Sequence, residues 1–253
     1  MKNPAKLTLF ISLFTIVFFD LRALGSGMLY DVESLIENLG GVTYLYSTIG
    51  TIFAIFGAFT ILSEWERWKA LVSAVKDEVR SLQELWLWSK HFPLSVRKRF
   101  RQLLKAYVLS VQSKGWMLLE KGQRHKSVDD ILSQMHDEIF LLAKDKTHLL
   151  DTSFSLFTEL LKYRNERLNL SAANMPAILR NVFILSDALL IGLSLFIGVR
   201  SISLAYIFTL AVAVLGYSIY LLIDDLDHPL QAGGWHLTTK DYEELSRTFE
   251  EES

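Results

Sequence analysis

The stretch GVTYLYSTIGTIFAIFGAFTILS, from Gly41 to Ser63, contains no charged residue and is long enough to cross a lipid bilayer. A membrane-spanning helix requires roughly 20 mainly apolar residues. Similar stretches occur at residues 7–30, 176–199 and 201–223. The last of these is also free of charge, whereas the other two contain charged side chains. We therefore predict an all-α membrane protein with four transmembrane helices.

The composition narrows the class of protein. The chain has 253 residues, of which 51% are hydrophobic and 21% charged, and the apolar residues are gathered into long runs. It has no cysteine, which excludes disulfides and thiolate chemistry. A net charge of −2 gives no general attraction to nucleic acid, so none is expected as a partner. The sequence lacks a phosphate-binding glycine loop, a serine nucleophile elbow and zinc-type histidine spacing, so we expect neither an enzyme nor a cofactor.

The distribution of charge predicts the orientation in the membrane. Residues 31–40 contain three acidic residues and no basic one, whereas residues 64–175 are rich in lysine and arginine. Basic residues are retained on the cytoplasmic side of a membrane. We therefore expect two helical hairpins in the inner cell membrane, with a cytoplasmic helical bundle at 64–175 inserted between them. Both termini, including the tail 224–253, are then cytoplasmic, and residues 1–253 form a single domain.

The N-terminus allows a second interpretation. Lys2 and Lys6 precede an apolar run at residues 7–19, as in a secretory signal peptide, and residues 23–27 offer small side chains for cleavage. The alternative is an uncleaved first span.

The middle region predicts further helices. The second span continues without a breaker to Lys90, and Pro93 separates it from a helix at 94–120. A third helix starts near Ser127. The basic residues between Arg97 and Lys105 form either a solvated helix face or a surface for anionic lipid headgroups.

Three charged residues lie within the predicted spans, namely Asp20, Arg22 and Asp187. Such residues are costly in a bilayer and usually face the bundle interior or a water-filled cavity. They form either a structural ion pair, for example between Arg22 and Asp187, or part of an ion pathway. Arg180 lies close enough to the end of its span to reach the headgroups.

The second span has two distinct stripes at helical spacing. Small residues form one stripe, which favours close helix packing in lipid: Ser47, Gly50, Ala54 and Gly57. Large apolar residues form the other: Ile49, Ile52, Phe56 and Phe59. The second stripe is either a hydrophobic constriction of a pore or a surface for lipid and neighbouring helices.

An acidic cluster follows the fourth span. Asp224, Asp225 and Asp227, with His228, are weak candidates for a hard-cation site, because calcium takes several oxygen ligands. The spacing is not that of a calcium-binding helix–loop–helix, and the segment is equally typical of a helix end before Pro229.

Two short motifs stand before the third predicted span and at the end of the fourth. The sequence Arg164-Asn165-Glu166-Arg167-Leu168 precedes Met175-Pro176, and Leu226-Asp227-His228-Pro229-Leu230 leads to Gly233. These motifs resemble those of the bacterial bestrophin-like family. Bestrophins are pentameric ion channels with four spans per subunit, a pore lined by the second helix and a hydrophobic neck. The resemblance therefore implies a homo-oligomer that conducts ions, with Ile52, Phe56 and Phe59 at the neck. It does not imply calcium gating, because the residues that follow Pro229 here are uncharged.

Two other functions remain open. One is a membrane-anchored structural or signalling protein without a pore, whose cytoplasmic helices bind a partner. The other is a transporter or proton relay that uses Asp20, Arg22 and Asp187.

Overall fold

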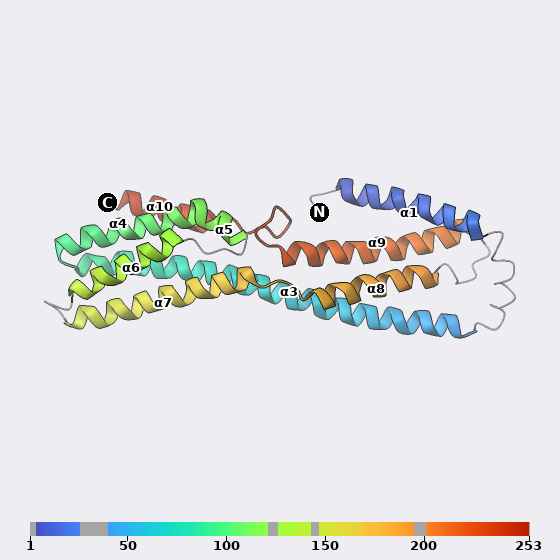
Figure 1. The fold of residues 1–253 in the computed structure, drawn as a ribbon, viewed down its shortest axis with the longest axis horizontal. Coiled ribbons are helices and arrows are strands. Elements are labelled where there is room, and N and C mark those ends of the chain that lie inside the picture. The colour runs from blue at the N-terminus through green and yellow to red at the C-terminus, as the bar shows by residue number, and fades with distance from the viewer. Residues whose placement is uncertain (1–3, 26–39, 121–125, 143–146, 195–200, 253) are drawn as a thin grey trace. The chain divides into compact units, whose positions relative to one another are not determined.

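The computed structural model describes residues 4–25, 40–120, 126–142, 147–194 and 201–252. Within these ranges the regular secondary structure is helical throughout (Figure 1). The chain divides into two compact units. Unit 1 comprises Met1–Trp65 and Met175–Asp227, and unit 2 comprises Glu66–Asn174 and His228–Ser253.

Unit 1 contains the apolar helices. These are α1 (Pro4–Gly25), the first part of α3 (Gly40–Trp88), α8 (Ala177–Ser194) and α9 (Ile202–Asp227). Among the described residues, three stretches are long and apolar enough to cross a membrane: Tyr44–His91, Leu149–Ser194 and Ile202–Asp227. They include most of the predicted second, third and fourth spans. The predicted first span extends beyond α1, and the predicted loops at 31–40 and 199–201 lie largely outside the described residues, so the four-span topology remains a prediction.

Helices α8 and α9 form an antiparallel pair, which lies side by side in Figure 1. The Ser194 hydroxyl, at the end of α8, donates to Thr209 Oγ1 in the first half of α9, at 3.1 Å. Asp187, midway along α8, lies against Gly216 of α9. Because the two helices are antiparallel, the start of α8 lies beside the end of α9.

Helix α1 packs along α9, also antiparallel. The ring of Phe10 stacks on that of Tyr217, with centroids 4.2 Å apart. Two turns further along α1, Phe18 meets Tyr206 at 5.3 Å, and the hydroxyls of Thr15 and Tyr206 are hydrogen-bonded at 2.8 Å. An aromatic seam therefore connects the N-terminal helix to the last apolar helix.

Helix α3 meets α8 where large side chains of α8 lie against glycines of α3. A Cβ placed on Gly57 would lie 3.5 Å from Phe183, and one on Gly50 would lie 3.8 Å from Leu190. Five buried residues of this unit form a hydrophobic cluster: Phe53, Met175, Phe183, Leu190 and Ile223.

Unit 2 is a separate helical bundle. It contains the remainder of α3, a 3₁₀ turn η1 (Ser89–His91), α4 (Leu94–Ser110), a π-helical turn η2 (Val111–Gly115), α5 (Trp116–Glu120), α6 (Lys126–Leu141), α7 (Thr147–Ala172) and α10 (Lys240–Glu251). Pro93 ends the first segment as predicted. The predicted helix at 94–120 is continuous but contains the π-helical turn.

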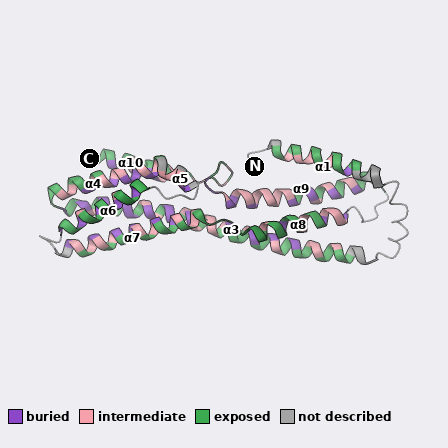
Figure 2. Ribbon diagram, viewed as in Figure 1, coloured by how far each residue is buried: buried purple, intermediate pink, exposed green. Residues whose placement is uncertain are grey.

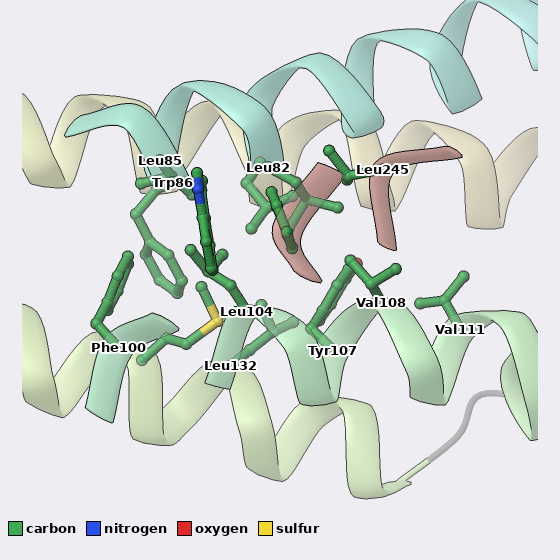
Figure 3. Close-up of a cluster of buried hydrophobic side chains, with 14 of the residues drawn as sticks. Leu82, Leu85, Trp86, Phe100, Leu104, Tyr107, Val108, Val111, Leu132 and Leu245 are labelled. Atoms are coloured by element: carbon green, nitrogen blue, oxygen red, sulfur yellow. The ribbon is translucent and has the colours of Figure 1, made fainter. Parts of the chain in front are cut away.

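The core of unit 2 lies between α3, α4, α6, α7 and α10. Figure 3 shows Trp86, Leu104, Tyr107 and Leu132 pointing toward one another from three of these helices. The short C-terminal helix α10 is amphipathic, and its apolar face enters the core through Tyr242, Leu245 and Phe249, all of which are buried.

Candidate functional site

The first part of α3 has one packed face and one exposed face. Phe53, Gly57 and Thr60 are buried within unit 1. The opposite side exposes four large apolar side chains at spacings of three, four and three: Ile52 (59% exposed), Ile55 (53%), Phe59 (68%) and Leu62 (50%). Figure 2 shows exposed residues recurring along this half of the helix. We call these four residues the outer stripe.

The apolar residues predicted for a neck divide between two environments. Ile52 and Phe59 belong to the outer stripe. Ile49 and Phe56 are half-buried and pack against the hydrophobic cluster of unit 1. The structure thus brings only half of the predicted stripe to the exposed face.

The predicted small-residue stripe divides in the same way. Gly50 and Gly57 lie against side chains of α8. Ser47 and Ala54 are exposed. The packed face of α3 is centred on Phe53, between the two predicted stripes.

Of the three predicted intramembrane charges, Asp20 and Asp187 have different surroundings. Asp20 is exposed on α1, and the side chain of Arg22 lies outside the described residues. Asp187 packs on the backbone of α9, where a Cβ on Gly216 would overlap the carboxylate and lie only 2.6 Å from its Oδ2. The other carboxylate oxygen, Oδ1, is buried and has no hydrogen-bond partner among the described residues.

The carboxylate of Asp227 joins the end of α9 to the start of α8. Its Oδ1 accepts a hydrogen bond from the Met175 N–H at 2.7 Å, and its Oδ2 accepts one from Arg180 Nη2 at 2.6 Å. Asp227 is 2% exposed, so these two donors take the place of water at its buried carboxylate. Arg180, which we expected to reach the headgroups, instead pairs with this carboxylate.

The acidic cluster at the end of α9 lies near no further converging ligands among the residues that the structure describes. Within the described ranges, no group of three or more histidine and acidic side chains converges as metal ligands would. Both oxygens of Asp227 are engaged by donors. Asp224 and Asp225 are half-buried.

Unit 2 contains a buried polar quartet that the sequence did not predict: Glu78, Tyr107, Arg167 and Tyr242. Glu78 on α3 accepts two hydrogen bonds from Arg167 on α7, at 2.6 and 3.2 Å, and one from the Tyr107 hydroxyl on α4 at 2.7 Å. The side chains of Glu78 and Arg167 are 0% and 4% exposed. A buried charge requires this kind of pairing and hydrogen bonding.

Burial or neighbouring charge raises the pKa values of Tyr107, Arg167 and Tyr242 well above their ordinary values. Burial raises the pKa of Tyr107 well above its ordinary value, and the Glu78 carboxylate raises it further. Burial alone would lower the pKa of Arg167, but the charge and hydrogen bonds of the Glu78 carboxylate hold it well above its ordinary value. Arg167 is therefore charged and the tyrosines are neutral. The hydrogen bonds of Glu78 link α3, α4 and α7, whereas the buried hydroxyl of Tyr242 on α10 has no hydrogen-bond partner among the described residues.

The other arginine of the same motif is also paired. Arg164, one turn before Arg167 on α7, donates to Asp129 on α6. Both arginines quoted for the family resemblance thus hold α7 within unit 2. A single sequence reveals that these charges exist, but not which partners they meet.

Comparisons with known proteins agree with this architecture. The model of the Bestrophin-like domain matches residues 33–233. Nothing among the curated proteins matches. Among solved structures, a point variant of a bacterial bestrophin homolog from Klebsiella pneumoniae has a TM-score of 0.76 at 14% identity, over 97% of this chain and 99% of that one.

Two other crystal structures give the same result. Another structure of the Klebsiella pneumoniae homolog, solved by zinc phasing, has a TM-score of 0.64 at 16% identity, over 94% of this chain and 97% of that one. A point variant of a membrane protein has a TM-score of 0.74 at 13% identity, over 98% and 96%. These likenesses show a shared fold. Because the matched domain covers most of the sequence, the chain belongs to the bestrophin-like family.

Proposed function

We propose that this protein is an ion channel formed by several copies of the chain, with a pore lined by the outer stripe of α3. Family membership supplies the functional class, since the resemblance to bestrophins implies a homo-oligomeric channel, pentameric by analogy. The permeant ions and the surrounding bilayer are then its partners.

The outer stripe is the observation that carries this proposal. A pore-lining helix must pack against its own subunit on one side and leave the other side open to the oligomer axis. The first part of α3 has this property, because Phe53 and Gly57 are buried while Ile52 and Phe59 are exposed. Rings of apolar side chains can close a pore by dewetting.

The seam between α1 and α9 supports the proposed four-span topology. Helix α9 is a candidate membrane span, and α1 lies along it through Phe10, Thr15 and Phe18. A helix of 22 residues at about 1.5 Å rise each is about as long as the hydrocarbon core is thick. We propose that α1 is retained as the first span and that both termini lie on the cytoplasmic side of the inner membrane.

Ion flux through liposomes tests the pore. We expect the purified oligomer to conduct, and Phe59→Ala to increase the flux by widening an apolar constriction. Phe56→Ala is the matched control, since it removes the same side chain one turn away from a half-buried position. It should reduce stability more and flux less.

Equal increases in flux from both variants would contradict the assignment of the outer stripe. Protein that is oligomeric in detergent but silent in a range of salts would overturn the channel proposal. That outcome would favour a membrane-anchored protein whose unit 2 binds a partner.

A further inference from the structure

A cavity of about 310 Å³ lies in unit 2 between α3 and α10. Aromatic side chains hold these two helices apart: the rings of Trp86 on α3 and Phe249 on α10 stack with their centroids 4.1 Å apart. Because two large rings separate the backbones, the smaller side chains beside them do not fill the space between the helices. Small-molecule sites in proteins have volumes of roughly 300–1,000 Å³, so the cavity is large enough for a small ligand.

Part of the cavity wall is apolar and belongs to the core of unit 2. Val79 of α3 and Leu245 of α10 line the cavity, and both side chains pack in the hydrophobic cluster of this unit. Leu245 is buried and Val79 is half-buried. The cluster holds both side chains in place, so a ligand can cover this apolar surface without a rearrangement of the core.

Charged side chains of opposite sign also line the cavity. Lys76 belongs to α3, whereas Asp241 and Glu244 belong to α10 and lie one helical turn apart. Within the described part of the chain, none of these three side chains has an ion-pair or hydrogen-bond partner. Gln83 and Thr248 add neutral hydrogen-bonding groups. The cavity therefore offers one positive group and two negative groups to the same ligand.

We propose that this cavity binds a small zwitterion with an ammonium group, a carboxylate group and a short apolar body, as in an aliphatic α-amino acid. Asp241 and Glu244 accept charge-assisted hydrogen bonds from the ammonium group, and Lys76 donates to the carboxylate group. The apolar body lies on Val79 and Leu245. A simple anion would be repelled by the two carboxylates and a simple cation by Lys76, so a ligand with both charges is favoured over either. Such binding does not depend on a pore.

Saturation-transfer difference NMR tests the site, with L-leucine as the probe and the full chain in nanodiscs of neutral lipid. We expect saturable binding of leucine. The affinity should fall about two- to fivefold in Lys76→Gln, and by a similar factor in Glu244→Gln, because each change removes one exposed charged contact. Lys69→Gln on α3 and Glu250→Gln on α10 are the matched controls, since they remove exposed charges from the same helices outside the cavity. They should leave the affinity unchanged.

Two analogues of leucine test the two charges separately. Isopentylamine lacks the carboxylate group and 4-methylpentanoate lacks the ammonium group, so each should bind more weakly than leucine. Lys76→Gln should strengthen the binding of isopentylamine, and Glu244→Gln that of 4-methylpentanoate, because each change removes a repelling charge. The proposal is overturned if leucine binding does not saturate, if a control variant weakens it as much as Lys76→Gln does, or if either analogue binds as tightly as leucine. Lys76 and Glu244 are exposed, so loss of folding does not confound these comparisons.

Discussion

Replacing Gly216 with alanine tests how closely α8 and α9 pack in unit 1. A Cβ at this position would overlap Oδ1 and Cγ of Asp187 and lie 2.6 Å from its Oδ2, well inside van der Waals contact. The carboxyl must rotate away or the helices must separate, and overpacking of this kind costs about 1–3 kcal/mol. The better helix propensity of alanine offsets up to about 1 kcal/mol. With the full offset, we expect Gly216→Ala to lower the free energy of unfolding by up to roughly 2 kcal/mol.

A double-mutant cycle assigns this cost to Asp187. Asp187→Ala removes the atoms that the new methyl group would meet, so Gly216→Ala should be neutral or stabilising in that background. The coupling free energy should reach about 1–3 kcal/mol. Asp187→Asn separates size from charge, because asparagine has the same shape and keeps the clash.

The measurement is detergent-induced unfolding in mixed micelles, followed by circular dichroism. Gly192→Ala on α8 is the matched control, since a Cβ there would meet no described atom within 4 Å. If Gly216→Ala is equally costly with and without the Asp187 carboxyl, the close contact between the two residues does not hold.

Three changes in unit 2 test its buried elements. Arg167→Gln should cost about 3–5 kcal/mol because it leaves Glu78 charged and buried, and the added change Glu78→Gln should recover part of that loss in thermal unfolding. Burial holds the pKa of Tyr107 above its value of about 10 in the unfolded chain, so its contribution to stability is complete below pH ~10 and falls as pH rises further. The alkaline decline in unfolding free energy should be about 1.4 kcal/mol per pH unit shallower in Tyr107→Phe; an unchanged slope would contradict the assignment. Gly115→Ala places a Cβ 2.8 Å from the Ser110 carbonyl oxygen in the π-helical turn, and should lower the melting temperature at a cost of roughly 1–3 kcal/mol.

The helices were predictable where their causes are local. The charge-free runs at 41–63 and 201–223 lie within or almost within α3 and α9, because length and composition alone decide whether a helix suits a bilayer. Pro93 ended a helix as predicted, since proline restricts the residue before it. The π-helical turn at Val111–Gly115 was not predicted. Nothing in the local sequence distinguishes it from an α-helical turn containing glycine.

For α3, the sequence predicts which residues share a face of the helix, but not which face is buried. Periodicity places Gly50 with Gly57 and Ile52 with Phe59, but it does not say which stripe meets the rest of the subunit. The buried face proved to be centred on Phe53, between the predicted stripes, because the partners on α8 are large side chains that reach the glycines from one side. Ile55, which belonged to neither stripe, is exposed as Ile52 and Phe59 are.

The pairing of buried charges depends on contacts distant in sequence. Taken alone, Asp187 is explained as an intramembrane charge that faces the bundle interior or a water-filled cavity. Gly216, taken alone, is explained as a small residue that lets two helices pack closely. In the structure each accounts for the other, because the missing side chain of Gly216 makes the space that the Asp187 carboxyl fills. The same reasoning applies to Arg167, whose partner Glu78 lies 89 positions earlier in the chain. The sequence does not show that Arg167 pairs with Glu78, since many other acidic residues could satisfy the charge of Arg167 equally well. The fold chooses between these pairings by placing α3 beside α7, and substitutions at such sites must therefore be tested in pairs.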